Sequence, residues 1–389
     1  MIHIVSKPSR LYLSCVVFVF AATHAFAENA PSHTPQKISQ LKAKAEQGFV
    51  QQEVQLANAC FMGDGVLQDF AEAARWYERA AEAGHPGAQN QIGYFYHAGI
   101  GVPVDLERSA HWFQRASASG SVIGTVNLGV AYLEGIGIPK SGEMAVQLLS
   151  EAFHKGSGTA ASFLGDMYYF GEGVPQDRVA AENWYQAGVK LHDSFAAYKL
   201  GVLYAATDGH VQDFHKAAGL LRISANDGYV PAMHSLGLLL VEHPEFAKSS
   251  HEAQTLLEEA AAAGSWRSSM LLGIMARDGK GILADRKLAY YYLQVSAHQG
   301  GEEALRKVAY EIRKLESDLK PEVREELTAT ADGWASQHHV ALLHIYKKKR
   351  NSENFPAVAI AIAPEGSFVG KLIPLPQGQD FKTSGEATP

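Results

Sequence analysis

Glycine recurs along this chain at a fixed interval of 36 residues, and this period constrains the fold more than any other feature. One series breaks only at His192, where the next glycine is expected. Its members are Gly48, Gly84, Gly120, Gly156, Gly228, Gly264 and Gly300. A second series has the same period and no gap: Gly93, Gly129, Gly165, Gly201, Gly237 and Gly273. A period of this length predicts an array of stacked units rather than a set of compact domains.

Two further features recur in the same phase. Paired glycines occur as Gly63/Gly65, Gly99/Gly101, Gly135/Gly137, Gly171/Gly173 and Gly279/Gly281. One bulky apolar residue follows in each unit: Trp76, Trp112, Leu148, Trp184, Leu220, Leu256 and Tyr292. Three coincident series cannot be an accident of composition, so seven units fill residues 49–300.

Each unit predicts two helices joined by a tight turn. In the second unit, Pro86–Ala98 carries its apolar residues at helical spacing. Gly99 and Gly101 follow, where glycine permits a positive φ and ends the first helix. Asp105 is placed to cap a second helix that runs to about Ser119. Aspartate recurs at this position as Asp69, Asp177, Asp213 and Asp285.

The second glycine series lies inside the first helix of each pair, where glycine costs about 1 kcal/mol relative to alanine. This repeated cost predicts that the two helices approach closely where no Cβ intervenes. We expect alanines on the second helix to form the matching flat surface, with the bulky apolar series filling the space between successive units. These alanines are Ala80, Ala116, Ala152, Ala187, Ala225, Ala260 and Ala297.

One unit shows the complete pattern. It reads Ala160, Leu164-Gly165, Tyr168, Gly171-Glu172-Gly173-Val174, Asp177, Ala181 and Trp184-Tyr185. This pattern resembles the Sel1-like repeats, relatives of the tetratricopeptide repeats. The resemblance implies an all-α fold, a right-handed α/α solenoid that serves as an interaction scaffold. In secreted bacterial members it implies roles in envelope assembly, signalling or host contact.

The expected architecture is therefore seven 36-residue helix-turn-helix repeats with N- and C-terminal capping helices. Two turns depart from the pattern. Around Gly209 the fifth unit keeps one loop glycine, and residues 242–245 of the sixth unit contain none. We expect these turns to differ in shape.

The N-terminus has the features of an export signal. Lys7 and Arg10 precede the apolar stretch Leu11–Ala22, and Ala25-Phe26-Ala27 offers a signal peptidase site. We expect residues 1–27 to be removed before Glu28, which leaves no membrane segment and an exported protein in the periplasm or outside the cell. The alternative is an uncleaved membrane anchor.

The remaining flanks are assigned from their composition. Residues 28–36 are expected to be a flexible leader, residues 37–48 an N-capping helix, and residues 301–346 two C-capping helices, the second starting at Pro321. Residues 347–389 contain a basic run and a largely disordered tail. Within this tail, Ala357–Ala363 is expected either to form an isolated strand or to pack against another surface.

Charge and cysteine content exclude several classes of function. The chain has 34 Lys and Arg against 41 Asp and Glu, a net charge of −7, which argues against nucleic acid as a partner. Cys15 and Cys60 are the only cysteines, so a disulfide framework or a multi-thiolate zinc cluster is excluded. Cys60 is expected to be a buried apolar residue.

No motif predicts catalysis, a cofactor or a metal. A solvated helix surface explains His338, His339 and His344 better than a metal site does. The basic run Lys347–Arg350 needs no polyanionic ligand to explain it, because a helix C-terminus already favours positive charge. Some cysteine-rich Sel1-like proteins have been associated with β-lactam hydrolysis. Ser39–Lys42 and Ser317–Lys320 match one motif of serine β-lactamases, but the partner motifs are absent. We therefore expect a protein that is not an enzyme.

The first helices carry apolar and aromatic residues at positions i, i+4 and i+7, where a solvated face would be charged. We expect this face to be a groove that binds a peptide or helical segment of another protein. One alternative is that curvature buries these positions. Another is an adaptor that binds peptidoglycan or another envelope glycan for a cell-wall enzyme, with tyrosines stacking on sugars. The candidate residues are Asn90, Tyr94, His97, Val130, Asp166, Tyr169, Tyr198, His234, Leu238 and Arg277.

Overall fold

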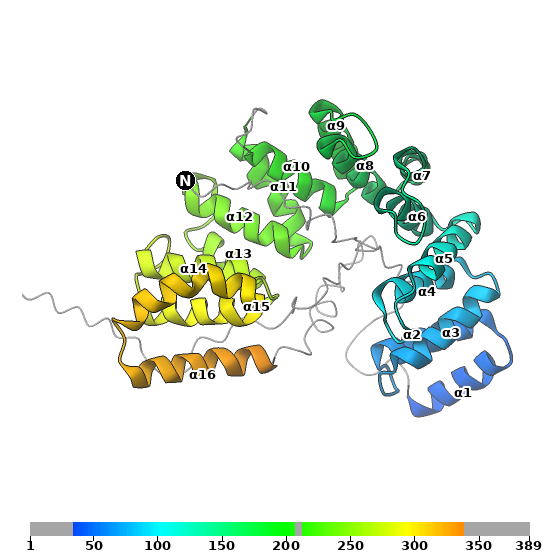
Figure 1. Ribbon diagram of the computed structural model, residues 1–389, viewed down its shortest axis with the longest axis horizontal. Coiled ribbons are helices and arrows are strands. Elements are labelled where there is room, and N and C mark those ends of the chain that lie inside the picture. The colour runs from blue at the N-terminus through cyan, green and yellow to red at the C-terminus, as the bar shows by residue number, and fades with distance from the viewer. Residues whose placement is uncertain (1–33, 207–211, 338–389) are drawn as a thin grey trace, which may run out of the picture. The chain divides into compact units, whose positions relative to one another are not determined.

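The computed structural model describes residues 34–206 and 212–337, and all regular structure assigned within them is helical. These residues form two compact units, one ending at Tyr229 and the other starting at Val230. Each unit is an array of consecutive helix pairs (Figure 1). The expected all-α solenoid class is confirmed.

Unit 1 contains a capping helix and five helix pairs. The capping helix is α1 (Pro35–Glu46), and it packs on α2 through Ile38, Leu41 and Ala45. The pairs are α2 (Val50–Met62) with α3 (Phe70–Glu82), α4 (Pro86–Ala98) with α5 (Leu106–Ala118), α6 (Val122–Glu134) with α7 (Gly142–His154), α8 (Gly158–Phe170) with α9 (Arg178–Lys190), and α10 (Ser194–Ala205) with α11 (Phe214–Asn226).

Unit 2 contains two helix pairs and a closing helix. The elements are α12 (Val230–Glu242), the short 3₁₀ helix η2 (Pro244–Phe246), α13 (Glu252–Ala262), α14 (Trp266–Asp278), α15 (Arg286–Glu316) and α16 (Pro321–Gln337). The turn without glycines is the one that holds η2, so the expected difference in shape is confirmed there. The fifth turn, residues 207–211, lies outside the described residues.

The predicted capping residues occupy the predicted places. Asp105 Oδ1 accepts a hydrogen bond from the backbone N–H of Arg108 at 3.0 Å, and the same bond is made at Asp69, Asp177, Asp213 and Asp285. The first helices α2, α4, α6, α8 and α14 each end at a glycine with φ between 67° and 75°.

The first glycine series is required by backbone conformation. Its members from Gly48 to Gly264 have φ between 85° and 91°, and a Cβ at Gly84 or Gly120 would meet no atom within 4 Å. His192 fills the gap in the series and also has a positive φ, 58°. At the end of the seventh repeat the positive φ belongs to Gly301 (φ 54°, ψ −140°) and not to Gly300, and this residue separates the repeat from the helix that follows.

The second glycine series is required by packing. A Cβ at Gly165 would lie 2.4 Å from Cε1 of Tyr185 on the paired helix. The corresponding distances to the nearest side-chain atom are 2.8 Å for Gly93 and Phe113, 3.0 Å for Gly129 and Leu149, 2.9 Å for Gly201 and Leu221, 2.6 Å for Gly237 and Leu257, and 2.8 Å for Gly273 and Leu293. The predicted close approach is therefore confirmed.

The prediction that alanines of the second helix face these glycines is wrong. A bulky side chain, twenty residues further along the chain, fills the space left by each missing Cβ. Ala116 of the alanine series instead meets the next repeat. A Cβ at Gly124 of α6 would lie 2.5 Å from Cβ of Ala116 on α5. Small residues thus bring successive pairs together, while glycine accommodates a large side chain within each pair.

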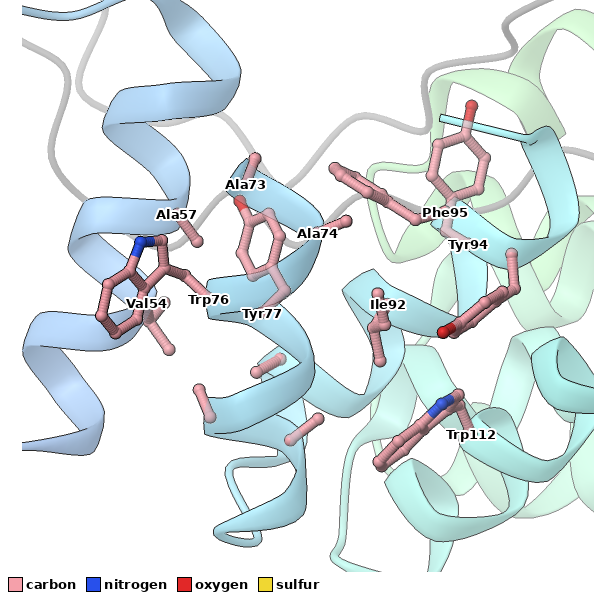
Figure 2. Packing of buried hydrophobic residues seen from close by; sticks show 14 of the residues in the cluster. Val54, Ala57, Ala73, Ala74, Trp76, Tyr77, Ile92, Tyr94, Phe95 and Trp112 are labelled. Carbon is pink, nitrogen blue, oxygen red and sulfur yellow. The ribbon is translucent and has the colours of Figure 1, made fainter. Parts of the chain in front are cut away.

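Figure 2 shows the resulting core near the start of unit 1. Trp76 of α3 lies beside Val54 of α2, and Tyr77 of α3 lies on the side of Phe95 of α4. The rings of Tyr77 and Phe95 meet edge to face at 5.3 Å. Each second helix is therefore buried against the first helix of its own pair and that of the next.

The end of unit 2 is closed by α16. Leu327, Ala331 and Trp334 are buried against α15. This confirms that a helix starting at Pro321 covers the last pair. Outside the described residues lie the expected signal 1–27, the first part of the expected leader, the end of the second C-capping helix, the histidines at 338, 339 and 344, the basic run and the Ala357–Ala363 segment. The expected leader 28–36 is too long at its C-terminal end, because α1 already starts at Pro35.

Candidate functional site

The first helices lie on the inner side of each array. In unit 1, α4 contacts α6, α6 contacts α8 and α8 contacts α10, and in unit 2 α12 contacts α14, whereas successive second helices contact one another less closely. Polar bonds reinforce the contacts between first helices. Asn127 Nδ2 donates to Asn90 Oδ1 at 2.8 Å, and His234 Nδ1 lies 3.0 Å from Ser268 Oγ. An array spaced in this way curves toward its first helices.

The groove residues predicted in the first half of unit 1 are buried. Asn90 is 1% exposed, Tyr94 4% and Val130 2%. The ring of Tyr94 points away from Trp76 and Tyr77 (Figure 2), and burial raises the pKa of its hydroxyl. His97 is half-buried, and burial lowers its pKa to about 4. At Asn90, Tyr94 and Val130 the structure thus corresponds to the alternative in which packing covers the groove positions.

The predicted positions on α8 and α10 are half-buried. Tyr169 and Tyr198 are each partly accessible. Asp166 accepts a hydrogen bond from the Tyr185 hydroxyl at 2.6 Å and forms an ion pair with Lys199 at 3.0 Å. Burial and the Asp166 carboxylate raise the pKa of Tyr185 well above its usual value. Asp166 therefore joins α8 to both α9 and α10.

Aromatic side chains gather beside this ion pair. The ring of Phe195 lies 6.2 Å from that of Phe163 and 5.9 Å from that of Tyr229, and Tyr198 lies 5.0 Å from Tyr229. The Lys199 ammonium lies 4.8 Å from the Phe195 ring centroid. We call Phe163, Phe195, Tyr198 and Tyr229 the aromatic patch. Its members except Phe163 are half-buried, so the patch offers apolar rings with a cation beside them.

Sequence analysis identified one member of the aromatic patch, Tyr198, and missed the others. The position of Tyr229 in the repeat could have indicated its role. Tyr229 occupies the position before a first helix where five other repeats place a capping side chain and only the first repeat, with Phe49, does not. The capping residues are His85, Ser121, Ser157, Asp193 and Ser265. Losing such a cap costs about 1 kcal/mol, and a residue that breaks a local rule points to another role.

Unit 2 has a second half-buried face on its first helices. His234 and Leu238 of α12 lie there, and burial with the nearby Arg267 lowers the pKa of His234 to about 4. Arg277 of α14 bonds to Asp278 at 2.6 Å and to Glu311 of α15, and these bonds raise its pKa. The charge of Arg277 is thus compensated within unit 2.

The described residues contain no cluster of three or more His, Cys, Asp or Glu side chains able to hold a metal ion. Cys60 is buried, as expected, and burial raises the pKa of its thiol. Among helices of the described ranges, none combines the length and apolar character needed to cross a membrane. The arrangement in unit 1 provides apolar contact area and a few fixed polar groups.

Comparisons with known proteins agree with this geometry. The family model described as Sel1 repeat matches residues 53–85, 86–121, 123–157, 158–193, 194–229 and 267–301, and its one long gap, residues 230–266, contains the turn with η2. A Sel1 repeat protein from Oxalobacter formigenes is 26% identical, with a TM-score of 0.51 over 75% of this chain and 83% of that chain. No curated protein matches the chain.

A second solved structure, a protective antigen of uropathogenic Escherichia coli strains, is 23% identical over 83% of this chain and 77% of that chain, with a TM-score of 0.41. An immunity protein from Pseudomonas aeruginosa is 20% identical over 60% of this chain and 81% of that chain, with a TM-score of 0.38.

Proposed function

Because this chain belongs to the Sel1 repeat family, whose solenoids generally serve as protein-interaction scaffolds, we propose that it binds a peptide or helical segment of another protein on its first helices. The single observation that supports this most is the aromatic patch. It collects three half-buried rings, those of Phe195 and Tyr198 on α10 and of Tyr229 before α12, around the buried Phe163 of α8. Large aromatic side chains beside a cation are typical anchors of protein interfaces.

The proposal assigns partner binding to fewer residues than the set of groove residues predicted from the sequence. Tyr169 and Tyr198 remain candidates, with Phe195 and Tyr229 added. His234, Leu238 and Arg277 form the corresponding candidate face in unit 2. Asn90, Tyr94 and Val130 support the packing of α4 and α6, since they are nearly inaccessible.

The test immobilises two matched variants of the protein and measures how much of each envelope protein from the native host they retain. Tyr198→Ser removes a ring of the aromatic patch, and Ile223→Ser removes an apolar side chain that is 49% exposed on the second helix α11. Truncating an interface anchor typically costs 2 kcal/mol or more, so we expect Tyr198→Ser to weaken binding about 30-fold and Ile223→Ser to leave it unchanged. Equal binding by both variants would refute the role of the aromatic patch.

Sedimentation with purified sacculi tests the glycan alternative, which the partial exposure of Tyr169 and Tyr198 favours. If the chain binds protein, it stays in the supernatant while still retaining its partner. If it binds glycan, it sediments, and Tyr198→Ser releases it.

Export is part of the proposal and is supported by the basic, apolar and small-residue segments of residues 1–27. Cell fractionation with mass spectrometry of the N-terminus tests it. The expected product starts at Glu28 and lies outside the cytoplasm. An intact N-terminus in the cytoplasmic fraction would contradict export.

A further inference from the structure

A second surface of unit 1 lies at the turns that join the first and second helix of a pair. These turns are residues 62–72, 98–108, 134–144 and 170–180. A Cβ on the second glycine of a turn would collide with the backbone of the turn before it. The pairs that meet in this way are Gly101 and Phe70, Gly137 and Leu106, and Gly173 and Gly142. The four turns therefore form one continuous surface, which we call the turn edge.

Apolar side chains are exposed along the turn edge. Leu67 is 92% exposed, Val104 62% and Val179 65%, and Phe70 and Leu106 are exposed as well. The opposite edge of unit 1 is formed by the turns that lead from one pair to the next, residues 79–89, 115–125, 151–161 and 187–197. In these turns, all of which the structure describes, Leu191 is the only exposed large apolar residue. Single exposed apolar residues are normal, whereas a row of them indicates an interaction surface.

Charge distinguishes the same two edges. The turn edge has nine acidic residues against three Lys and Arg, whereas the opposite edge has three acidic residues against four Lys and Arg. Six of the nine cap a second helix or lie in its first turn, where negative charge is favoured. The other three, Asp64, Glu134 and Glu172, lie at the C-terminal ends of first helices, where the helix dipole disfavours them. Helix formation does not explain these three carboxylates, and they make the turn edge complementary to a basic partner.

We propose that the turn edge binds a basic amphipathic helix of a partner protein, with apolar side chains against the exposed apolar row and Lys or Arg side chains beside the carboxylates. The turn edge contains helix ends and turns but no strand, so an extended partner would find no strand to pair with. A helix satisfies its own backbone groups. Four turns about 10 Å apart span about 30 Å, the length of a helix of about 20 residues. The turn edge shares no residue with the aromatic patch, so this inference does not depend on the proposed function.

Fluorescence anisotropy of a labelled peptide, titrated with the full chain, tests the proposal. The probe is a synthetic helical peptide of about 21 residues, with leucine at the first and fourth positions of each heptad, lysine at the second and sixth, and alanine elsewhere. A control peptide has glutamate in place of lysine. We expect the lysine peptide to bind at least about tenfold more tightly than the glutamate peptide. Equal affinity for the two peptides, or binding of neither, would overturn the proposal.

A matched pair of apolar variants locates the contact. Leu67→Ser removes a side chain of the turn edge. Leu283→Ser removes its equivalent six repeats later, which is 85% exposed in a turn of unit 2 with two acidic residues against three Lys and Arg. Both side chains are largely exposed, so the fold should be kept, which circular dichroism checks. We expect Leu67→Ser to weaken binding of the lysine peptide about fivefold and Leu283→Ser to leave it unchanged. Equal affinity of the two variants would refute the proposal.

A matched pair of charge variants tests the carboxylates. Glu134→Gln/Glu172→Gln acts on the turn edge, and Glu82→Gln/Glu151→Gln makes the same charge change on the opposite edge. We expect the first pair to weaken peptide binding about fivefold at an ionic strength of about 10 mM and less than about twofold at about 1 M, because salt screens the attraction. The second pair should leave binding unchanged. Equal weakening by both pairs would show attraction by net charge alone and would contradict the proposal. None of these variants alters the aromatic patch, so partner retention there is a separate result.

Discussion

Replacing Gly165 by alanine tests the packing argument most directly, since two opposing effects can be weighed from the structure. A Cβ there would lie 2.4 Å from Cε1 and 2.5 Å from Cδ1 of Tyr185. Carbon atoms in contact prefer about 3.5–4 Å, so the ring would have to move by about 1 Å. Tyr185 is 2% exposed and bonded to Asp166 at 2.6 Å, which leaves it little freedom to move.

We place the overpacking cost at about 3 kcal/mol, the upper part of the usual range for a well-packed core. Alanine recovers about 1 kcal/mol of helix propensity, so the net destabilisation is about 2 kcal/mol. With a urea dependence of about 2 kcal/mol per molar, the unfolding midpoint falls by about 1 M. Far-ultraviolet circular dichroism during urea unfolding measures this shift.

Gly219 supplies the matched control. It lies inside α11, is exposed, and a Cβ there would meet no atom within 4 Å. Gly219→Ala should therefore raise the midpoint by about 0.5 M through helix propensity alone. Opposite signs at Gly165 and Gly219 support the packing account. If Gly165→Ala stabilises the protein as much as Gly219→Ala does, the reasoning is refuted.

Three further predictions concern single positions. His192→Gly should raise the free energy of unfolding by about 0.5–1 kcal/mol in urea unfolding, because it relieves a positive φ of 58°; no gain would show that His192 is unstrained. His234 has a folded pKa of about 4 against an ordinary 6.5, so unfolding takes up a proton between these values. Stability should be constant above about pH 6.5 and fall as the pH drops toward 4, and His234→Gln should remove that part of the pH profile. Arg79→Met should destabilise unit 1 by about 3 kcal/mol, since Glu53 is 1% exposed and its carboxylate contacts Arg79 at 2.6 Å. Adding Glu53→Gln to Arg79→Met should recover part of the loss, and an unchanged midpoint in both variants would contradict this assignment.

The regular part of the fold was predictable because each repeat carries its own local signals. Asp105 and its equivalents cap the second helices, and the loop glycines end the first helices with a positive φ. These are properties of a few neighbouring residues, so they can be recognised without knowing what surrounds them. At the end of the seventh repeat two glycines are adjacent, and the sequence does not show that Gly301 rather than Gly300 adopts the positive φ.

The candidate site was predictable only in part. Helical spacing placed Tyr94 and Tyr198 on the same face of their helices, yet one is 4% exposed and the other half-buried. The difference depends on packing by neighbouring helices, which spacing within one helix does not describe. The aromatic patch was missed for the same reason, since Phe195 and Tyr229 belong to different repeats and meet only when the pairs stack.

The helices, their pairing and their period could therefore be derived from the amino-acid order, because caps, turns and small residues act over a few positions. Tertiary structure alone decided which residue fills the space at each helical glycine and which first-helix side chains stay accessible. Phe113 rather than an alanine lies against Gly93, and Tyr198 rather than Tyr94 remains partly accessible. Both outcomes depend on how closely helices distant in sequence approach, and that distance is set by all the side chains between them.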